Sequence, residues 1–240
     1  MARIETHRLT GWTEFKTVVY PTLFGEDRFY ENRFAFRGMA DESWQLISSF
    51  DRRASSMELG ERHAASERLL GLFVEECDDD DSITPCPPDV DNQIAVAQHH
   101  GLPTRALDWS DSPYVAAFFA YFGAPTVREH EAPTAAIWAL NLEHAAWNGS
   151  MGARLLRPSR RDDERMLRQR GLFSYLEAPF DSLEEYVEMC PGDEAALWKF
   201  VVPRSESEQA IADLAAMGIT ATRLFVDRNG AAQAALARFS

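Results

Sequence analysis

Hydrophobic and polar positions along this chain form patterns that predict both strands and helices. Phe34 and Phe36 are separated by a single small residue, an alternation typical of a half-buried strand, and Gly38 follows as a point for a turn or a close backbone approach. Apolar or β-rich runs predict further strands or extended segments at residues 104–110, 135–142, 172–176, 197–202 and 219–226.

Apolar residues at helical spacing predict helices at residues 59–76, 92–100, 113–122, 205–217 and 231–239. Two of them follow a Ser-x-x-Glu capping-box pattern, which begins at Ser55 and at Ser205. The helix that begins after Ser112 and Pro113 is so rich in Phe and Ala that we expect it to be buried on most sides.

Helices and strands are mixed without a regular βαβ repeat, which indicates an α+β protein. Because no repeat or long linker interrupts the chain, we expect a single domain over residues 1–240. Its core would span about residues 30–180, with the C-terminal β-α elements of residues 195–240 packed on it.

Composition narrows the class of protein. The 240 residues carry 24 Lys and Arg against 38 Asp and Glu, a net charge of −14, so the surface as a whole repels nucleic acid unless a local basic site exists. No stretch approaches the roughly 18 apolar residues that span a bilayer. Three cysteines at irregular spacing argue against a disulfide framework, and we expect a cytoplasmic protein with no membrane partner.

The densest group of chemically versatile side chains lies between Gln98 and Pro113. It holds two imidazoles, a guanidinium, two carboxylates and an indole in a loop and short strand between two helices, which is where functional sites often lie. A purely structural interpretation is also open, in which Ser112 caps a helix, Arg105 pairs with Asp108, and Trp109 is part of the core. No metal site is expected, because adjacent histidines on a helix point about 100° apart.

Three parts of the sequence together resemble the FRG domain family, which is named for its (Phe/Tyr)-Arg-Gly motif. The first is Phe36-Arg37-Gly38, and the second is the run from Ala97 to Ser110, which reads AQHHGLPTRALDWS. The third is the Gln-x-Gly-x-Phe segment that begins at Gln169. Ala106 departs from the family, which usually has a larger aliphatic residue there.

The order of these residues is also similar, more distantly, to that of ADP-ribosyltransferases. That resemblance implies a split mixed or antiparallel β-sheet core with flanking helices, and an enzyme that consumes NAD. It implies catalytic roles for Arg37, His99, His100 and Gln169, with Glu177 as a less favoured substitute for Gln169. NAD would be bound by Arg37, Gly38, Thr104, Arg105, Asp108, Trp109 and Ser110.

The same resemblance implies a bacterial toxin or phage-defence effector that modifies a macromolecular acceptor and has an antitoxin or inhibitory protein as partner. Two alternatives remain open from the residues. One is a non-catalytic module that binds a nucleotide, and the other is a metal-dependent nuclease that uses Asp108, Asp111 and the histidines.

Overall fold

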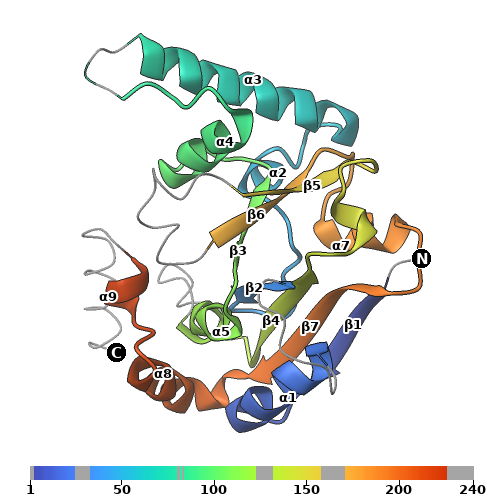
Figure 1. Cartoon of the computed structure of the whole chain (residues 1–240), viewed down its shortest axis with the longest axis vertical. Helices are drawn as coiled ribbons and strands as arrows, with labels where there is room; N and C mark the ends of the chain where they lie inside the picture. The colour runs from blue at the N-terminus through green and yellow to red at the C-terminus, as the bar shows by residue number, and fades with distance from the viewer. Residues whose placement is uncertain are drawn as a thin grey trace.

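A computed structural model describes residues 3–24, 33–79, 82, 84–122, 132–157 and 171–225, and all structural statements concern these residues. The strands are β1 (Arg3–Arg8), β2 (Phe34–Met39), β3 (Ala106–Ser110), β4 (Thr134–Asn141), β5 (Ala153–Leu156), β6 (Gly171–Leu176) and β7 (Ala195–Pro203). The helices are α1 (Trp12–Phe24), α2 (Ser49–Arg53), α3 (Leu59–Asp78), α4 (Val90–His99), α5 (Pro113–Phe122), α7 (Leu183–Met189), α8 (Ser207–Ala216) and α9 (Ala221–Leu224) (Figure 1).

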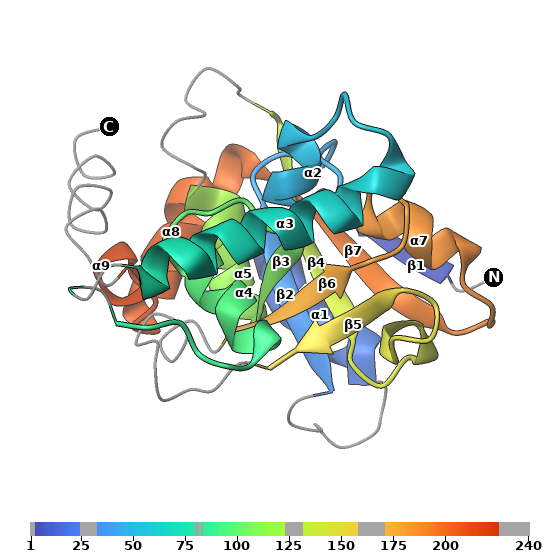
Figure 2. The ribbon, with the colours of Figure 1, turned by 90° about the horizontal axis from the view of Figure 1, so that it is seen from above.

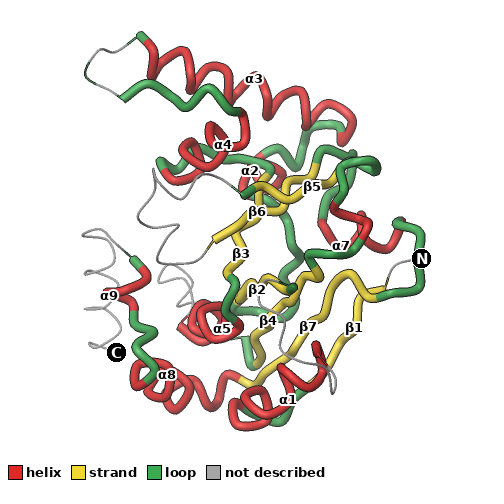
Figure 3. The backbone as a smooth tube through the Cα atoms, viewed as in Figure 1, coloured by secondary structure: helices red, strands yellow, loops and turns green. Residues whose placement is uncertain are grey.

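The described strands form one seven-stranded mixed sheet in the order β1-β7-β4-β2-β3-β6-β5. Figure 3 shows these strands in yellow as a continuous curved layer with helices around it. β1 and β7 are parallel, and the other neighbours are antiparallel. β2 pairs with β4 along its whole length, from Phe34 to Met39, but it pairs with β3 only through Phe36 and Ser110. Of all neighbouring strands in the sheet, β2 and β3 therefore share the fewest paired residues.

Helices cover the sheet because alternate strand residues point to opposite faces. On one face, α1, α5, α8 and α9 pack on a core that includes Phe34, Phe36 and Ile137. On the other face, α7 packs on a core that includes Ala35 and Trp138. A smaller cluster joins α4 and Leu70 of α3 to β3, β5 and β6. In Figure 2, the view from above, α3 is the outermost element and lies across α4.

The structure confirms the α+β class and most of the elements predicted from the sequence. The strands predicted at 34–38, 135–142, 172–176 and 197–202 are β2, β4, β6 and β7, and the extended segment contains β3. The helices predicted at 59–76, 92–100, 113–122 and 205–217 are α3, α4, α5 and α8. Strong periodicity located these elements because each has one face or more in the core.

Three details of the sequence prediction are wrong. The described residues of the predicted strand, 219–225, do not form one, since α9 occupies Ala221–Leu224 and packs its apolar residues on α5 and α8. The two capping boxes do not form: α3 follows Glu58 and α8 follows Glu206, both without a side-chain cap. The carboxylate of Glu206 instead accepts a hydrogen bond from the backbone N–H of Trp12, at 2.6 Å. The helix predicted at 231–239 lies outside the described residues.

Candidate functional site

Arg37 lies at the junction of β2 and β3, which are joined by a single residue pair. Its Nη1 donates a hydrogen bond to the backbone carbonyl of Asp108 on β3, at 2.8 Å, and lies 3.7 Å from the Asp108 carboxylate oxygen Oδ2. The Arg37 side chain is 23% exposed, whereas that of Asp108 is 58% exposed. The buried Nε of Arg37 has no hydrogen-bond partner among the described residues. Arg37 therefore bridges two poorly paired strands and retains unused donors.

The electrostatic surroundings of Arg37 are mixed. Burial lowers the pKa of its guanidinium, the negative charge of Asp108 opposes that shift, and the positive charge of Arg52 on α2 adds to it. Arginine still stays protonated at any ordinary pH. The side chain is thus a partly desolvated cation with a carboxylate and a second guanidinium close by.

Arg37 also belongs to a row of residues that crosses the sheet. It pairs in register with Trp138 on β4, which pairs with Lys199 on β7, so all three share one face. The Lys199 ammonium lies 4.9 Å from the centroid of the Trp138 ring and donates to the backbone carbonyl of Glu42, at 2.6 Å. Because Trp138 is only 2% exposed, its ring is part of the core and offers no surface for a ligand to stack on.

Gly38 packs against a helix. A Cβ atom at this position would lie 1.8 Å from the backbone carbonyl oxygen of Ala116 and 2.7 Å from the backbone nitrogen of Ala120, both in α5. The absence of a side chain is therefore what lets α5 approach β2. This contact accounts for the glycine of Phe36-Arg37-Gly38, and the expected contact with a cofactor is not needed to explain it.

Arg105 does not point to a ligand site, which corrects the expectation that it binds NAD or pairs with Asp108. It is 1% exposed, and its Nε donates to both carboxylate oxygens of Asp51, at 3.1 and 3.2 Å. Its two terminal nitrogens donate to the backbone carbonyls of Glu177, Ala178 and Phe180. Every nitrogen of this guanidinium is engaged inside the protein.

Trp109 and Thr104 are also interior residues, which corrects their expected contact with NAD. Trp109 is 2% exposed, and its indole N–H donates to the hydroxyl of Ser174, at 2.9 Å. The Thr104 hydroxyl is buried and donates to the side-chain oxygen of Gln98. The purely structural interpretation, which placed Trp109 in the core, therefore holds for that residue. It also expected Arg105 to form an internal ion pair, which it does, but with Asp51 and not with Asp108.

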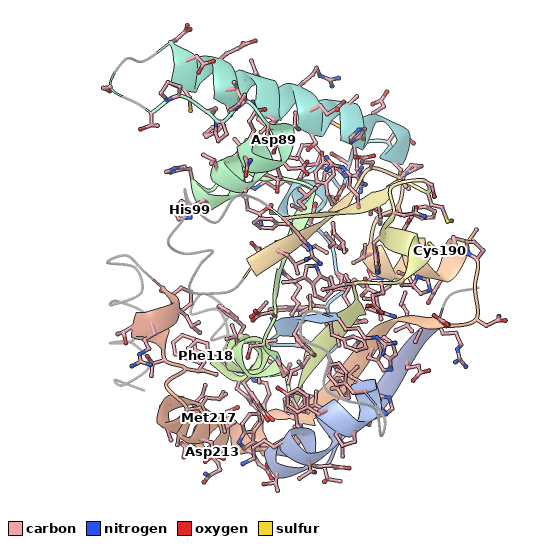
Figure 4. The ribbon with its side chains drawn as sticks, in the orientation of Figure 1. Asp89, His99, Phe118, Cys190, Asp213 and Met217 are labelled. Atoms are coloured by element: carbon pink, nitrogen blue, oxygen red, sulfur yellow. The ribbon has the colours of Figure 1, made fainter. Side chains whose placement is uncertain are left out.

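Ser110 and the two histidines lie at the ends of elements. Ser110 is buried at the end of β3, opposite Phe36, and its hydroxyl accepts from the backbone N–H of Ser112, at 3.2 Å. His99 and His100 are exposed at the end of α4, with ring centroids 5.1 Å apart in an edge-to-face arrangement. Figure 4 shows His99 at the margin of the described part of the chain.

Of the two residues expected in the third catalytic position, Gln169 lies outside the described residues. Glu177 follows β6 at the end that pairs with Ala106, whereas Gly171 at the other end pairs with Ser110. The carboxylate of Glu177 accepts from Nε of Arg154, at 2.8 Å. Glu177 is therefore held away from the Phe36–Ser110 junction, at the far end of β3.

Arg52, whose positive charge contributes to the lowered pKa of Arg37, is a residue that the sequence analysis did not single out. It belongs to the five-residue helix α2, which is too short to give a periodic signal. A pair of adjacent arginines, Arg52 and Arg53, is the only trace in the sequence, and most surface arginines are simply solvated. The position of α2 is set by its hydrogen bonds to Thr104 and Arg105.

Neither metal ligands nor a membrane span are evident in the part of the chain that the structure describes. No group of three or more His, Cys, Asp and Glu side chains there is arranged to hold a metal ion. None of the described helices combines the length and apolar character that crossing a membrane requires.

Comparison with known proteins finds one family model that matches part of the chain. No curated protein and no solved structure matches the chain. The model of the FRG domain matches residues 32–128, a range that includes Arg37, Gly38 and the whole run from Ala97 to Ser110. Residues 32–128 are therefore similar to an FRG domain, and the Phe-Arg-Gly motif of this segment both admits α5 and holds Arg37 against β3.

Proposed function

We propose that this protein is an NAD-consuming enzyme of the ADP-ribosyltransferase type. The observation that carries the proposal is the position of Arg37, a partly buried cation with an unpartnered Nε at the junction of β2 and β3. The carboxylate that pairs with this cation, that of Asp108, is 58% exposed and 3.7 Å away, and partly desolvated cations with spare donors are often found at ligand sites.

The chemistry of NAD cleavage suits this cation. Breaking the bond between nicotinamide and ribose passes through an oxocarbenium-like state, as in glycoside hydrolysis. The enzyme must hold the diphosphate while the sugar becomes cationic, and a guanidinium binds phosphate oxygens in a bidentate manner. In this proposal Arg37 holds the diphosphate of NAD.

The division of the sheet between β2 and β3 also supports the proposal. The single residue pair between β2 and β3 divides the sheet into a β1-β7-β4-β2 half and a β3-β6-β5 half. A split sheet of this kind is what resemblance to the ADP-ribosyltransferases implies. In the proposed enzyme the nucleotide lies over this division, within reach of Arg37 and Asp108.

The remaining roles are those that the resemblance to the ADP-ribosyltransferases implies. His99 and His100 are exposed and are assigned to hydrogen bonds with ribose hydroxyls or to deprotonation of an acceptor. Ser110, beside the β2–β3 junction, orients the nucleotide, and Gln169 holds a ribose hydroxyl. The acceptor is a macromolecule, and the biological role is that of a toxin or phage-defence effector with an inhibitory protein partner.

Release of nicotinamide from NAD tests the proposed function. We expect the purified protein to release nicotinamide, and Arg37→Ala to lower the rate by about 10²–10³-fold, the usual cost of removing a well-placed electrostatic group. Arg3→Ala is the control, because Arg3 is an exposed arginine at the edge strand β1. Chromatography of the products gives the rate, and circular dichroism checks that the variants are folded.

The alternative class is a non-catalytic module that binds a nucleotide, and the same Arg37 geometry favours it. The two functions differ in one measurement. If the wild-type protein binds ADP-ribose or NAD in an Arg37-dependent way but leaves NAD intact, the enzyme is excluded and the binding module stands. Equal turnover by wild type and folded Arg37→Ala would remove Arg37 from the site altogether.

A further inference from the structure

Asp108 is the one exposed residue of the strand β3. The other four residues of this strand are buried, whereas the Asp108 side chain is 58% exposed. β3 is also the strand on which Arg37 is anchored, through the backbone carbonyl of Asp108. Packing of the strand does not explain a carboxylate at this position.

Two different groups of Asp108 face the same nitrogen of Arg37. The backbone carbonyl accepts a hydrogen bond from Nη1 at 2.8 Å, and the carboxylate oxygen Oδ2 lies 3.7 Å from that nitrogen. The carbonyl can accept from a side chain because β2 and β3 share only the pair of Phe36 and Ser110. The anchor of Arg37 is therefore backbone, and the carboxylate is a second and longer contact.

The carboxylate of Asp108 is held loosely. Its distance from Nη1 exceeds that of a hydrogen bond, and ion pairs as exposed as this one contribute little to stability. Burial lowers the pKa of Arg37, and the negative charge of Asp108 opposes that shift. Asp108 thus compensates part of the charge of Arg37 while it remains easy to displace.

A ligand must approach Arg37 from the side that Asp108 occupies. Nε of the guanidinium is buried and has no partner among the described residues, so only the terminal nitrogens can meet a ligand from solvent. Nη1 is one of these two, and it is the nitrogen that the Asp108 carboxylate faces. An anion bound there lies near a second negative charge, which repels it unless the carboxylate moves away.

We propose that the Asp108 carboxylate competes with the phosphate of a nucleotide for Arg37, pairing with this cation in the free protein and leaving it when the nucleotide binds. A phosphate binds a guanidinium through two charge-assisted hydrogen bonds and so replaces the weaker pair. A ligand without negative charge gains nothing by displacing the carboxylate, which makes Asp108 a specificity-determining residue for anions. The inference rests on the proposed role of Arg37, and it reverses the role in binding NAD that the resemblance implied for Asp108.

Calorimetric binding of ADP and adenosine to the full chain tests the competition. Asp108→Asn removes the charge but keeps the shape and the backbone contact, so we expect it to tighten ADP binding by about fivefold, the most that an exposed ion pair usually contributes. Adenosine binding does not change. Glu143→Gln is the matched control, because Glu143 is 70% exposed and lies 3.5 Å from Nε of Arg33, so that it removes a similar charge from another ion pair and leaves ADP affinity unchanged.

The double variant Arg37→Ala/Asp108→Asn shows whether the effect acts through Arg37. In the Arg37→Ala background, Asp108→Asn no longer tightens ADP binding, because there is no cation to compete for. Thermal unfolding checks that each variant is folded. The proposal is overturned if Asp108→Asn weakens ADP binding or has no more effect than Glu143→Gln, or if neither wild type nor Asp108→Asn binds ADP.

Release of nicotinamide separates failure of the competition from failure of the enzyme. Tighter ADP binding by Asp108→Asn, in a protein that leaves NAD intact, supports the competition and contradicts the proposed enzyme. NAD cleavage whose KM is not lowered by Asp108→Asn supports the enzyme and contradicts the competition.

Discussion

The three residues of Phe36-Arg37-Gly38 face three different surroundings. Phe36 is buried in the core beneath α1 and α5, on the face opposite to Arg37. Arg37 reaches across to the backbone of Asp108, and Gly38 lies against the backbone of α5. Each residue type is needed for a separate reason: burial, spare hydrogen-bond donors, and the absence of a side chain.

Replacement of Gly38 tests the close approach of α5. We expect Gly38→Ala to destabilise the fold by about 3 kcal/mol, the upper end of the usual cost of overpacking, because the atom in its way is backbone and cannot rotate aside. Urea denaturation measures the free energy of unfolding.

Gly71→Ala is the control for that substitution. Gly71 lies within α3 with nothing inside 4 Å of the added methyl group, so alanine there stabilises the helix by about 1 kcal/mol. Unchanged stability of Gly38→Ala would mean that β2 and α5 are further apart than described.

At the scale of elements, a buried ion pair joins segments that are distant in the sequence. Arg105, at the entry to β3, pairs with Asp51 of α2, and its other nitrogens hold the backbone between β6 and α7. Asp51 also lies 3.9 Å from Nη1 of Arg62 on α3. This network fixes α2 against the entry to β3.

Arg105→Met tests whether this arginine belongs to the scaffold or to a ligand site. Removing one partner of a buried pair typically costs about 3–5 kcal/mol, because the other charge stays buried, here that of Asp51. We expect a loss of stability of this size in urea denaturation. Nucleotide affinity, measured per folded molecule, changes much less than in Arg37→Ala. A stable Arg105→Met variant that has lost nucleotide binding would contradict this assignment.

At the scale of the whole molecule, excess negative charge is the dominant electrostatic feature. The chain has 38 Asp and Glu against 24 Lys and Arg, so like charges repel one another over the folded surface.

Salt is expected to stabilise this protein. Raising NaCl from about 0.01 M to about 0.15 M shortens the screening length from about 30 Å to about 8 Å and weakens the repulsion between surface charges. At pH 7 the melting temperature should rise by about 2–4 °C for each kcal/mol of repulsion removed. Differential scanning calorimetry measures the shift. A falling melting temperature would show that attractive ion pairs outweigh the net repulsion.

The strongest periodic patterns of the chain were sufficient to predict its α+β class and the positions of β2, β4, β6, β7 and α5. The segments that were missed have weaker patterns. β1 has no fully buried residue in its burial pattern, and α1 contains an internal proline. Residues 219–226 are rich in β-formers, yet the contacts of Ala221 and Leu224 with the core favour a helical turn.

The site residues were harder to predict than the elements. Arg37 and Arg105 are both arginines within distinctive motifs, and the sequence gives no reason to assign them different roles. Arg105 is interior because Asp51, 54 residues earlier, folds against it, and Arg37 keeps free donors because β2 and β3 separate beside it. The sequence by itself determined which segments bury apolar faces, since that depends on local periodicity. Only the tertiary structure decided which charged groups are paired internally and which remain available, because that depends on partners distant in the chain.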